Sequence, residues 1–450
     1  MKRNSLRNFL VSTVVAVLCV FYFPCILCAA GEERIITLEQ AYDLALKTHE
    51  KIMISKKEVE KIGLLPKKAL SVMLPTAEIE GSFVRQKEEI RFGKEGEELV
   101  ALPSDQWFGN FNIEQPIYRG EFFPLRKKAL NSKDTSVQYC YKTIQDTLFE
   151  VANAYYEVLK AEELVKNTKE TLKLAEEELR VAKARFEVGE VTKTAILRAE
   201  VDVTRAKRNL IKNDNYLKLA KDTLSRLIGI KRINYHLIKP PTLPKIDEDY
   251  EILVSKALKH RYDYKISKLE VDIAKEDKNL VKARYHPILS AVWSYHRISP
   301  ETFIQRDGFW DASVRISIPI FEGSIRIWDF KEKQKALQQA SLAHKDLKKD
   351  IKIEVEDAML TVKTCESTLD NLRKEVELCE ENYHIIFERF KVGLATSLDV
   401  TDALTKLDSA RTELTTTTYD YQVALLNLKK SIGLFAREYM KNRLRKGSGI

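Results

Sequence analysis

The chain has 450 residues, of which 31% are charged and 44% are hydrophobic, enough for one large domain or for two or three ordinary ones. It holds only 15 glycines and 12 prolines, and its richness in Lys, Glu, Leu and Ala favours long helices. The formal charge of +9 comes from lysines and arginines scattered among acidic residues. This pattern favours solvated helix faces over a nucleic-acid footprint, so we expect no nucleic-acid partner.

Residues 1–30 are typical of a secretory signal peptide. Three basic residues precede an apolar run from Phe9 to Leu27, which is followed by Ala29 and Ala30. An uncleaved membrane anchor is the alternative, and a lipoprotein is disfavoured because Cys28 does not follow a small residue. No later run approaches the ~18 apolar residues of a membrane-spanning helix. We therefore expect an exported chain without transmembrane helices.

Three cysteines follow the predicted signal peptide: Cys140, Cys365 and Cys379. An odd number of cysteines in an oxidising compartment does not indicate a disulfide framework. Cys365 and Cys379 are 14 residues apart on one predicted helix. That separation is about 21 Å along the axis, so they cannot bridge within the helix.

The two halves of the chain repeat each other. Glycines are spaced by 69 and 40 residues in the first half and by 70 and 40 in the second: Gly120, Gly189 and Gly229, then Gly323, Gly393 and Gly433. Arg-Phe-Glu-Val-Gly at 185–189 matches Arg-Phe-Lys-Val-Gly at 389–393. These coincidences indicate a tandem duplication.

The duplication predicts the domain boundaries. The first repeat covers 31–238 and the second covers 249–434. A proline-rich linker at 239–248 joins them, because prolines at 240, 241 and 244 stop any helix there. A C-terminal tail at 435–450 follows.

Each repeat is expected to begin with a helix, at about 50–74 and 263–286, and to continue with a pair of strands. The strands are predicted at about 75–85 and 107–117, and at about 287–297 and 310–320. Apolar and polar residues alternate there with a period of two, the mark of a strand with one apolar face. We expect the apolar positions to face lipid: Trp310, Val314, Ile316, Ile318, Trp293, Phe111 and Ile113.

A strand of eleven residues tilted by about 40° rises about 28 Å, which suits an outer-membrane barrel. A soluble hairpin packed on a core is the alternative, but no other sheet is predicted that could supply the core. Four strands per chain cannot close, since known barrels have at least eight strands. Two chains would supply eight strands and three would supply twelve, so the chain is expected to oligomerise.

Long helices follow the strands, at about 121–188 and 323–392. No proline interrupts them after Pro124, and apolar residues recur with heptad spacing. Shorter helices return at about 192–228 and 397–433. A return helix covers only part of its partner, so we expect it to stack end to end with the helix at 50–74 or 263–286. A lone antiparallel coiled coil is the alternative, and it would leave half of the apolar heptad positions of each long helix exposed to water.

These features together resemble the TolC family of outer-membrane efflux proteins. The most telling motifs are the repeated Arg-Phe-Xxx-Val-Gly and Thr-Ser-Leu-Asp-Val at 396–400. The resemblance implies a mainly α fold with a membrane β-barrel: a homotrimer with a 12-stranded barrel, a coiled-coil α-barrel in the periplasm, and a mixed belt around its middle. It also implies the passive exit duct of a tripartite efflux pump or a type I secretion system. The partners would be a periplasmic adaptor and an inner-membrane transporter of the RND, ABC or MFS class.

The resemblance also assigns roles to residues near the helix turns. The turns would contact the adaptor through Val188, Gly189 and Glu190, and through Val392, Gly393 and Leu394. Asp399 and Asp402 would form acidic rings at the tunnel entrance, since residues three apart share a helix face. For Asp399, a capping box with Thr396 is the alternative, and both roles can hold.

The lock that closes the entrance of some relatives is not expected here. Those relatives use a tyrosine, an arginine and a further aspartate, where this chain has Phe390, Ala395 and Ala195.

Two other classes of protein compete with the channel. An exported enzyme is disfavoured, because the seven histidines are scattered and no clustered metal-ligand spacing or phosphate-binding loop is present. Carboxylates such as Glu354 and Glu356 are interpreted as solvated heptad positions. A periplasmic coiled-coil scaffold or adaptor would explain the helices but not the strands. We expect no cofactor and no metal.

Overall fold

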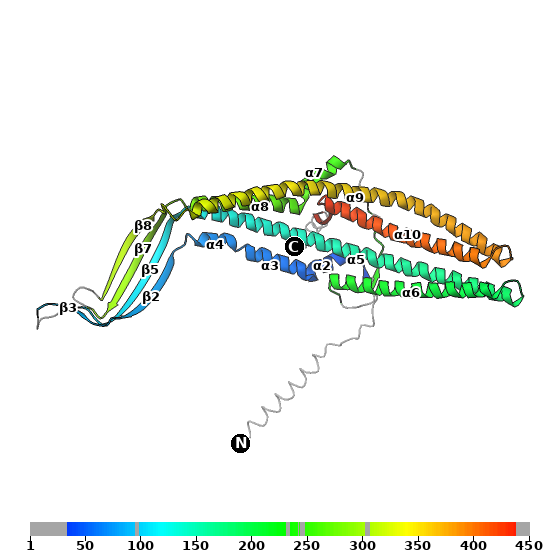
Figure 1. Cartoon of the computed structure of the whole chain (residues 1–450), viewed down its shortest axis with the longest axis horizontal. Coiled ribbons are helices and arrows are strands. Elements are labelled where there is room, and N and C mark those ends of the chain that lie inside the picture. Colours follow the sequence, from blue (N-terminus) through cyan, green and yellow to red (C-terminus); the bar gives the residue numbers. More distant parts are fainter. Residues whose placement is uncertain are drawn as a thin grey trace, which may run out of the picture.

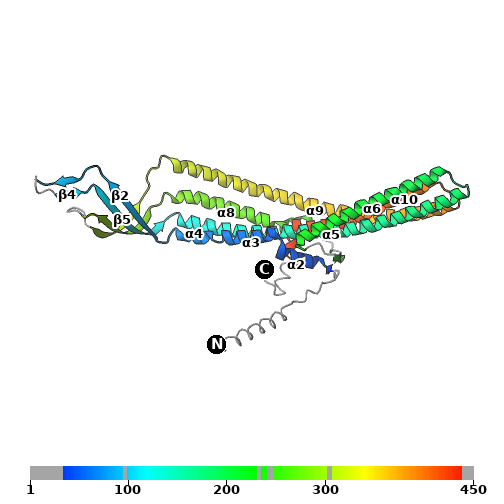
Figure 2. The same cartoon turned by 90° about the horizontal axis from the view of Figure 1, so that it is seen from below.

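The computed structural model describes residues 34–94, 99–230, 235–241, 243, 248–301 and 307–437. The molecule is elongated, with a sheet at one end and two helical turns at the other (Figure 1). Figure 2 shows the same arrangement turned by 90°. The expected signal peptide and parts of the linker and tail lie outside the described residues. Among the described helices, none combines the length and the apolar character needed to cross a membrane.

The two repeats contain corresponding elements. The first consists of α2 (Leu38–Thr48), α3 (Glu50–Ile62), α4 (Leu65–Ser71), β2 (Thr76–Arg85), β5 (Asp105–Arg119), α5 (Phe122–Glu187) and α6 (Lys193–Ile228). The second consists of α7 (Tyr250–His260), α8 (Tyr262–Ala283), β7 (Ile288–Ser299), β8 (Gly308–Ser317), α9 (Ile325–Lys391) and α10 (Ser397–Ser431). Helices α5 and α9 have 66 and 67 residues, so each is about 100 Å long.

Short helices stack end to end along the long ones. Helices α8 and α10 both pack between α5 and α9, with α8 toward the sheet and α10 toward the turns (Figure 1). Helices α3 and α4 pack along the sheet-proximal part of α5, and α6 packs along its distal part. This is the stacked arrangement and not the lone coiled coil.

The single helix expected at 50–74 was wrong, because it is broken into α3 and α4 at Gly63 and Leu64. Glycine is a poor helix former, and Pro66, the second residue of α4, lacks the N–H that would continue the hydrogen-bond ladder. The corresponding α8 has neither residue type and runs unbroken.

A short two-stranded sheet joins segments from the two ends of the first repeat. Strand β1 (Arg34–Ile36) pairs in parallel with β6 (Tyr235–Leu237). The buried Tyr155 of α5 places its hydroxyl 2.9 Å from the carbonyl oxygen of Ile36 and 2.7 Å from that of Ile238. The two short strands and Tyr155 therefore tie the start of the first repeat to its end.

The four long strands form one antiparallel sheet in the order β2-β5-β7-β8. Beyond β2 and β5, β3 (Ile90–Phe92) and β4 (Leu99–Leu102) form a short hairpin that the sequence did not indicate. The predicted fold class is confirmed: a mainly α, duplicated chain with long helices and four strands of barrel type.

Strand β8 ends at Ser317, three residues earlier than the alternation predicts. Pro319 has no N–H to donate to a neighbouring strand, so pairing stops before it. Ile318 and Ile320 are exposed beyond the end of β8. The prediction of Ile318 as a strand position was therefore wrong.

Candidate functional site

The strand register gathers the predicted lipid-facing side chains on one face of the sheet. Residues that are paired across antiparallel strands point to the same side. The paired positions are Phe111 with Tyr295, Ile113 with Trp293, Trp293 with Ala312, Trp310 with Tyr295, Val314 with Ala291, and Ile316 with Leu289. The Phe111 and Trp293 rings meet edge to face with centroids 6.0 Å apart. The result is a continuous apolar surface over three strands.

The opposite face of the sheet is polar. His296 on β7 lies 2.9 Å from the amide oxygen of Asn110 on β5 and 2.9 Å from a carboxylate oxygen of Asp311 on β8. The three side chains form a hydrogen-bonded row across the sheet. One face of the sheet is thus apolar, like the lipid side of a porin wall, and the other is polar, like its water-filled side.

At the far end of the molecule, α5 and α9 end in the same kind of turn. Gly189 and Gly393 have left-handed φ angles of 80° and 86°, which residues with a Cβ rarely adopt. The N–H of Glu190 donates to the Arg185 carbonyl at 2.9 Å, and that of Leu394 donates to the Arg389 carbonyl at 2.8 Å. This hydrogen bonding is that of the Schellman motif.

The residues of these turns are presented to solvent. Val188, Val392 and Leu394 are 70%, 70% and 69% exposed. Apolar side chains held out by a rigid turn are available for contact with another protein.

Arg185 links the two turns. Its guanidinium pairs with Glu190 at 3.0 Å, lies 5.1 Å from the centre of the Phe390 ring, and donates a hydrogen bond to the Phe390 carbonyl. A side chain at Gly393 would approach it, because an added Cβ would lie 3.2 Å from Nη2. The sequence singled out Arg185 only as part of a repeated motif, since nothing in the motif shows that α5 meets α9.

Phe390 and Ala195, which replace two residues of the relatives' lock, are buried in the chain. Phe390 is completely buried beneath Arg185. Ala395 is partly buried against the same apolar cluster. These three side chains therefore pack rather than bind polar partners.

Asp399 forms the capping box at the start of α10. Its N–H donates to the Thr396 hydroxyl at 3.3 Å, and its carboxylate accepts from the Thr396 N–H at 2.8 Å. The Thr396 backbone N–H and hydroxyl lower the pKa of Asp399 below its ordinary value, so the carboxylate is ionised at neutral pH. The capping box with Thr396, which the sequence analysis gave as the alternative role of Asp399, is thus present in the structure.

Asp402 lies one turn further along α10 and is exposed. Its carboxylate pairs with Lys406 at 2.8 Å, a contact four residues away that the sequence interpretation did not consider. Because both side chains are more than 60% exposed, the ion pair is weak and can open when another charge approaches. Asp399 and Asp402 are thus neighbours at the start of α10. Whether they face the axis of a channel is determined by how several chains assemble.

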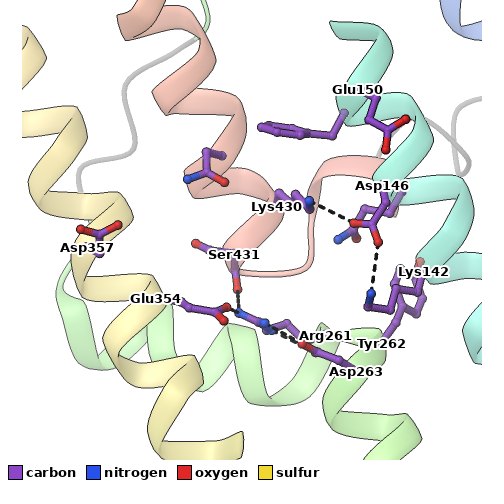
Figure 3. A pocket seen from close by; sticks show the side chains of 13 residues that line it. Lys142, Asp146, Glu150, Arg261, Tyr262, Asp263, Glu354, Asp357, Lys430 and Ser431 are labelled. Carbon is purple, nitrogen blue, oxygen red and sulfur yellow. Dashed lines mark hydrogen bonds and ion pairs between the residues drawn. The ribbon is translucent and has the colours of Figure 1, made fainter. Parts of the chain in front are cut away.

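A polar pocket of about 520 Å³ lies where α10 ends and α8 begins. Figure 3 shows Arg261 on one side of this pocket, joined to Asp263, Glu354 and Ser431. The distances are 2.6 Å to the Asp263 carboxylate, 2.5 Å to that of Glu354 and 3.3 Å to the Ser431 carbonyl. Glu354 is thus an ion-pair partner and not merely a solvated heptad position. Arg261 fixes the junction between the two stacked helices and their neighbour α9.

Among the described residues, the structure contains no group of three or more His, Cys, Asp or Glu side chains that could hold a metal ion. Within the same residues the three cysteines are free, with Cys140 buried and Cys365 and Cys379 half-buried.

The sequence matches the family described as outer membrane efflux protein over residues 71–230 and 253–434. The toluene efflux pump outer membrane protein TtgC of Pseudomonas putida is 26% identical over 383 residues, covering 80% of this chain and 75% of TtgC. The outer membrane protein TolC of Vibrio cholerae is 22% identical over 351 residues, covering 74% of this chain and 78% of TolC. The crystal structure of the Campylobacter jejuni CmeC outer membrane channel is similar, with a TM-score of 0.76 and 17% identity over 91% of this chain and 88% of CmeC.

The family match covers most of both repeats and includes all four long strands. The match decides between the classes that the sequence left open, because the matching family consists of outer membrane efflux proteins and not of enzymes or periplasmic scaffolds. The chain is an exit duct of the outer membrane that extends into the periplasm, and it is not an enzyme. It belongs to the outer membrane efflux protein family.

Proposed function

We propose that three copies of the chain close into one passive duct, with a 12-stranded barrel in the outer membrane and a helical tunnel in the periplasm. The strand register carries this proposal, because it gives a four-stranded sheet one apolar face and leaves β2 and β8 at its edges. Unpaired strand edges are not stable in lipid. Four strands cannot close alone, and three copies supply the twelve that the family resemblance implies.

The apolar face of the sheet then contacts lipid acyl chains through Trp310, Val314, Ile316, Trp293, Phe111 and Ile113. The polar row of Asn110, His296 and Asp311 faces the water-filled interior. This orientation follows from the cost of exposing charged and hydrogen-bonding side chains to hydrocarbon.

The helix turns are the surface for a periplasmic adaptor. Val188, Gly189 and Glu190 form one contact, and Val392, Gly393 and Leu394 form the other. The adaptor connects the duct to an inner-membrane transporter of the RND, ABC or MFS class, which supplies the energy. TtgC is named for a toluene efflux pump, and export of small molecules or of polypeptides by type I secretion fits the same duct.

Asp399 and Asp402 form stacked acidic rings at the entrance of the tunnel. Three chains bring six carboxylates near one axis, and a ring of like charges attracts cations. The capping bond of Asp399 does not conflict with this role, since it orders the first turn of α10 and keeps the carboxylate ionised.

A photo-crosslinking amino acid at the turns tests the adaptor contact in living cells. Placed at Val188 or Val392, it should yield adducts that contain a periplasmic adaptor, identified by mass spectrometry. Placed at Lys87, between β2 and β3 at the sheet end of the molecule and 94% exposed in its side chain, it should yield none. Adaptor adducts at Lys87, or their absence at both turns, would contradict the proposal.

A further inference from the structure

Two helix pairs pack against each other near the turns. The α5–α6 pair meets the α9–α10 pair through polar contacts and a small apolar core. The Thr401 hydroxyl of α10 donates to the Asp202 carboxylate of α6 at 2.7 Å, and the Thr171 hydroxyl of α5 donates to Asp408 of α10 at 2.8 Å. The interface between the two helix pairs therefore lies within one chain.

Glu178 of α5 is an unusual member of this interface. Its side chain is completely buried, and neither carboxylate oxygen has a hydrogen-bond partner in the described part of the chain. Tyr383 of α9 is also buried, and its hydroxyl likewise has no partner there. Asp202 is buried too, but it accepts from Thr401 and pairs with Arg205 at 3.3 Å. Of these three side chains, Glu178 is the one that would carry a charge without a hydrogen-bond partner if it were ionised.

The groups that face Glu178 favour its neutral form. Burial raises the pKa of Glu178 to about 8, and the negative charge of Asp202 on α6 adds to the rise. From α9, the Tyr383 hydroxyl is neutral, and burial together with Glu178 and Glu177 raises its pKa. Arg205 is engaged by Asp202. A buried carboxyl group without donors takes up a proton rather than stay charged.

We propose that Glu178 is a proton-responsive switch for the packing of the two helix pairs. When it is protonated, the α5–α6 pair packs tightly on the α9–α10 pair. When it is ionised, the carboxylate must reach water, and the two pairs separate near the turns. This device does not depend on the contact with an adaptor.

The direction of the pH effect follows from the two states of the carboxyl group. Its pKa is about 8 when packed and has its ordinary value of 4.5 when exposed. The packed arrangement is therefore most stable below pH 4.5, the ordinary pKa. Its stability falls as the pH rises toward about 8, the pKa of Glu178 in the packed arrangement. Between the two values, each pH unit changes the packing equilibrium by roughly tenfold. Acid tightens the interface and alkali loosens it.

A distance measurement on the full-length protein in detergent tests the switch. Spin labels at Val188→Cys and Val392→Cys report the separation of the two turns by pulsed electron paramagnetic resonance. Cys365 and Cys379 are replaced by serine, and Cys140 is buried and left in place. Labelled chains are diluted into an excess of unlabelled chains, so that distances within one chain dominate. The separation should increase between about pH 6 and about pH 9.

Glu178→Gln supplies the matched control, because the amide has nearly the same shape and does not titrate. It should hold the short separation over the whole pH range. Asp202→Asn should weaken the pH response, since without this negative charge the pKa of packed Glu178 is lower and ionisation opposes packing less. Circular dichroism would verify that both variants keep their helices. A pH response that is the same in the parent and in Glu178→Gln, or no response in the parent, would overturn the proposal.

Discussion

The sheet and the helix-turn end of the molecule separate polar from apolar side chains in different ways. In the sheet, apolar residues lie on one face and are largely exposed, as Trp310 and Val314 show. Near the turns, four helices close around Phe390 and bury even the carboxyl groups of Glu178 and Asp202. In the proposed assembly the sheet needs lipid and further strands from outside the chain, whereas the turn end already has an apolar core within one chain. Changes in the two regions should therefore be detected by different measurements.

The largest effect is expected at the turn end. Phe390→Ala removes a fully buried ring and should destabilise the local packing by about 3–5 kcal/mol. Amide hydrogen exchange should become faster in α5 and α9 near the turns and stay unchanged in the four strands. Exchange that rises equally in the sheet would show that the two regions are not independent.

The next effect concerns the apolar face of the sheet. Val314→Arg places a charge near the middle of β8, and it should impair insertion by about 2–4 kcal/mol. Ser313→Arg is the matched control, since Ser313 pairs with Val292 and points to the polar face. The amount of folded protein in the outer membrane measures both. Ile316 lies near the end of β8, so Ile316→Arg should cost less, about 1 kcal/mol at most. Equal losses in the Val314 and Ser313 variants would show that the assignment of the lipid-facing and water-facing sides of the sheet is wrong.

A smaller effect distinguishes the two repeats. Thr396 caps α10 with its side chain, whereas the corresponding Thr192 makes no capping bond at the start of α6. Ala195 occupies the position of Asp399 in the first repeat. Thr396→Ala should thus weaken the first turn of α10 by about 1 kcal/mol, and Thr192→Ala should change little. Hydrogen exchange at the two helix starts would reveal the difference, and equal changes would refute it.

The smallest structural effect is expected for Asp402→Ala. Its exposed ion pair with Lys406 contributes little to folding, so the fold should remain intact. If Asp402 belongs to an acidic ring, the variant should show lower cation selectivity in planar bilayers and weaker block by multivalent cations from the periplasmic side. Unchanged selectivity and block would mean that Asp402 faces away from the axis.

The sequence predicted those features that depend on local periodicity or spacing. Alternation over residues 310–317 indicated both faces of β8, and the separation of Thr396 from Asp399 indicated the capping box. The break at Gly63 and the end of β8 before Pro319 were missed, although both have local causes. Glu178 could not be found, because a glutamate in a heptad helix is normally solvated, and only the packing of neighbouring helices on α5 buries it. The contact of Arg185 with Phe390 depends on the same packing.

The central claim is that the sheet is completed by further copies of the chain. Native mass spectrometry of the complex extracted from the outer membrane in mild detergent tests it most directly. We predict a single species with the mass of three chains, which supplies the strands for a closed barrel. A folded monomer with native secondary structure would contradict the claim, because its sheet edges would have no partners.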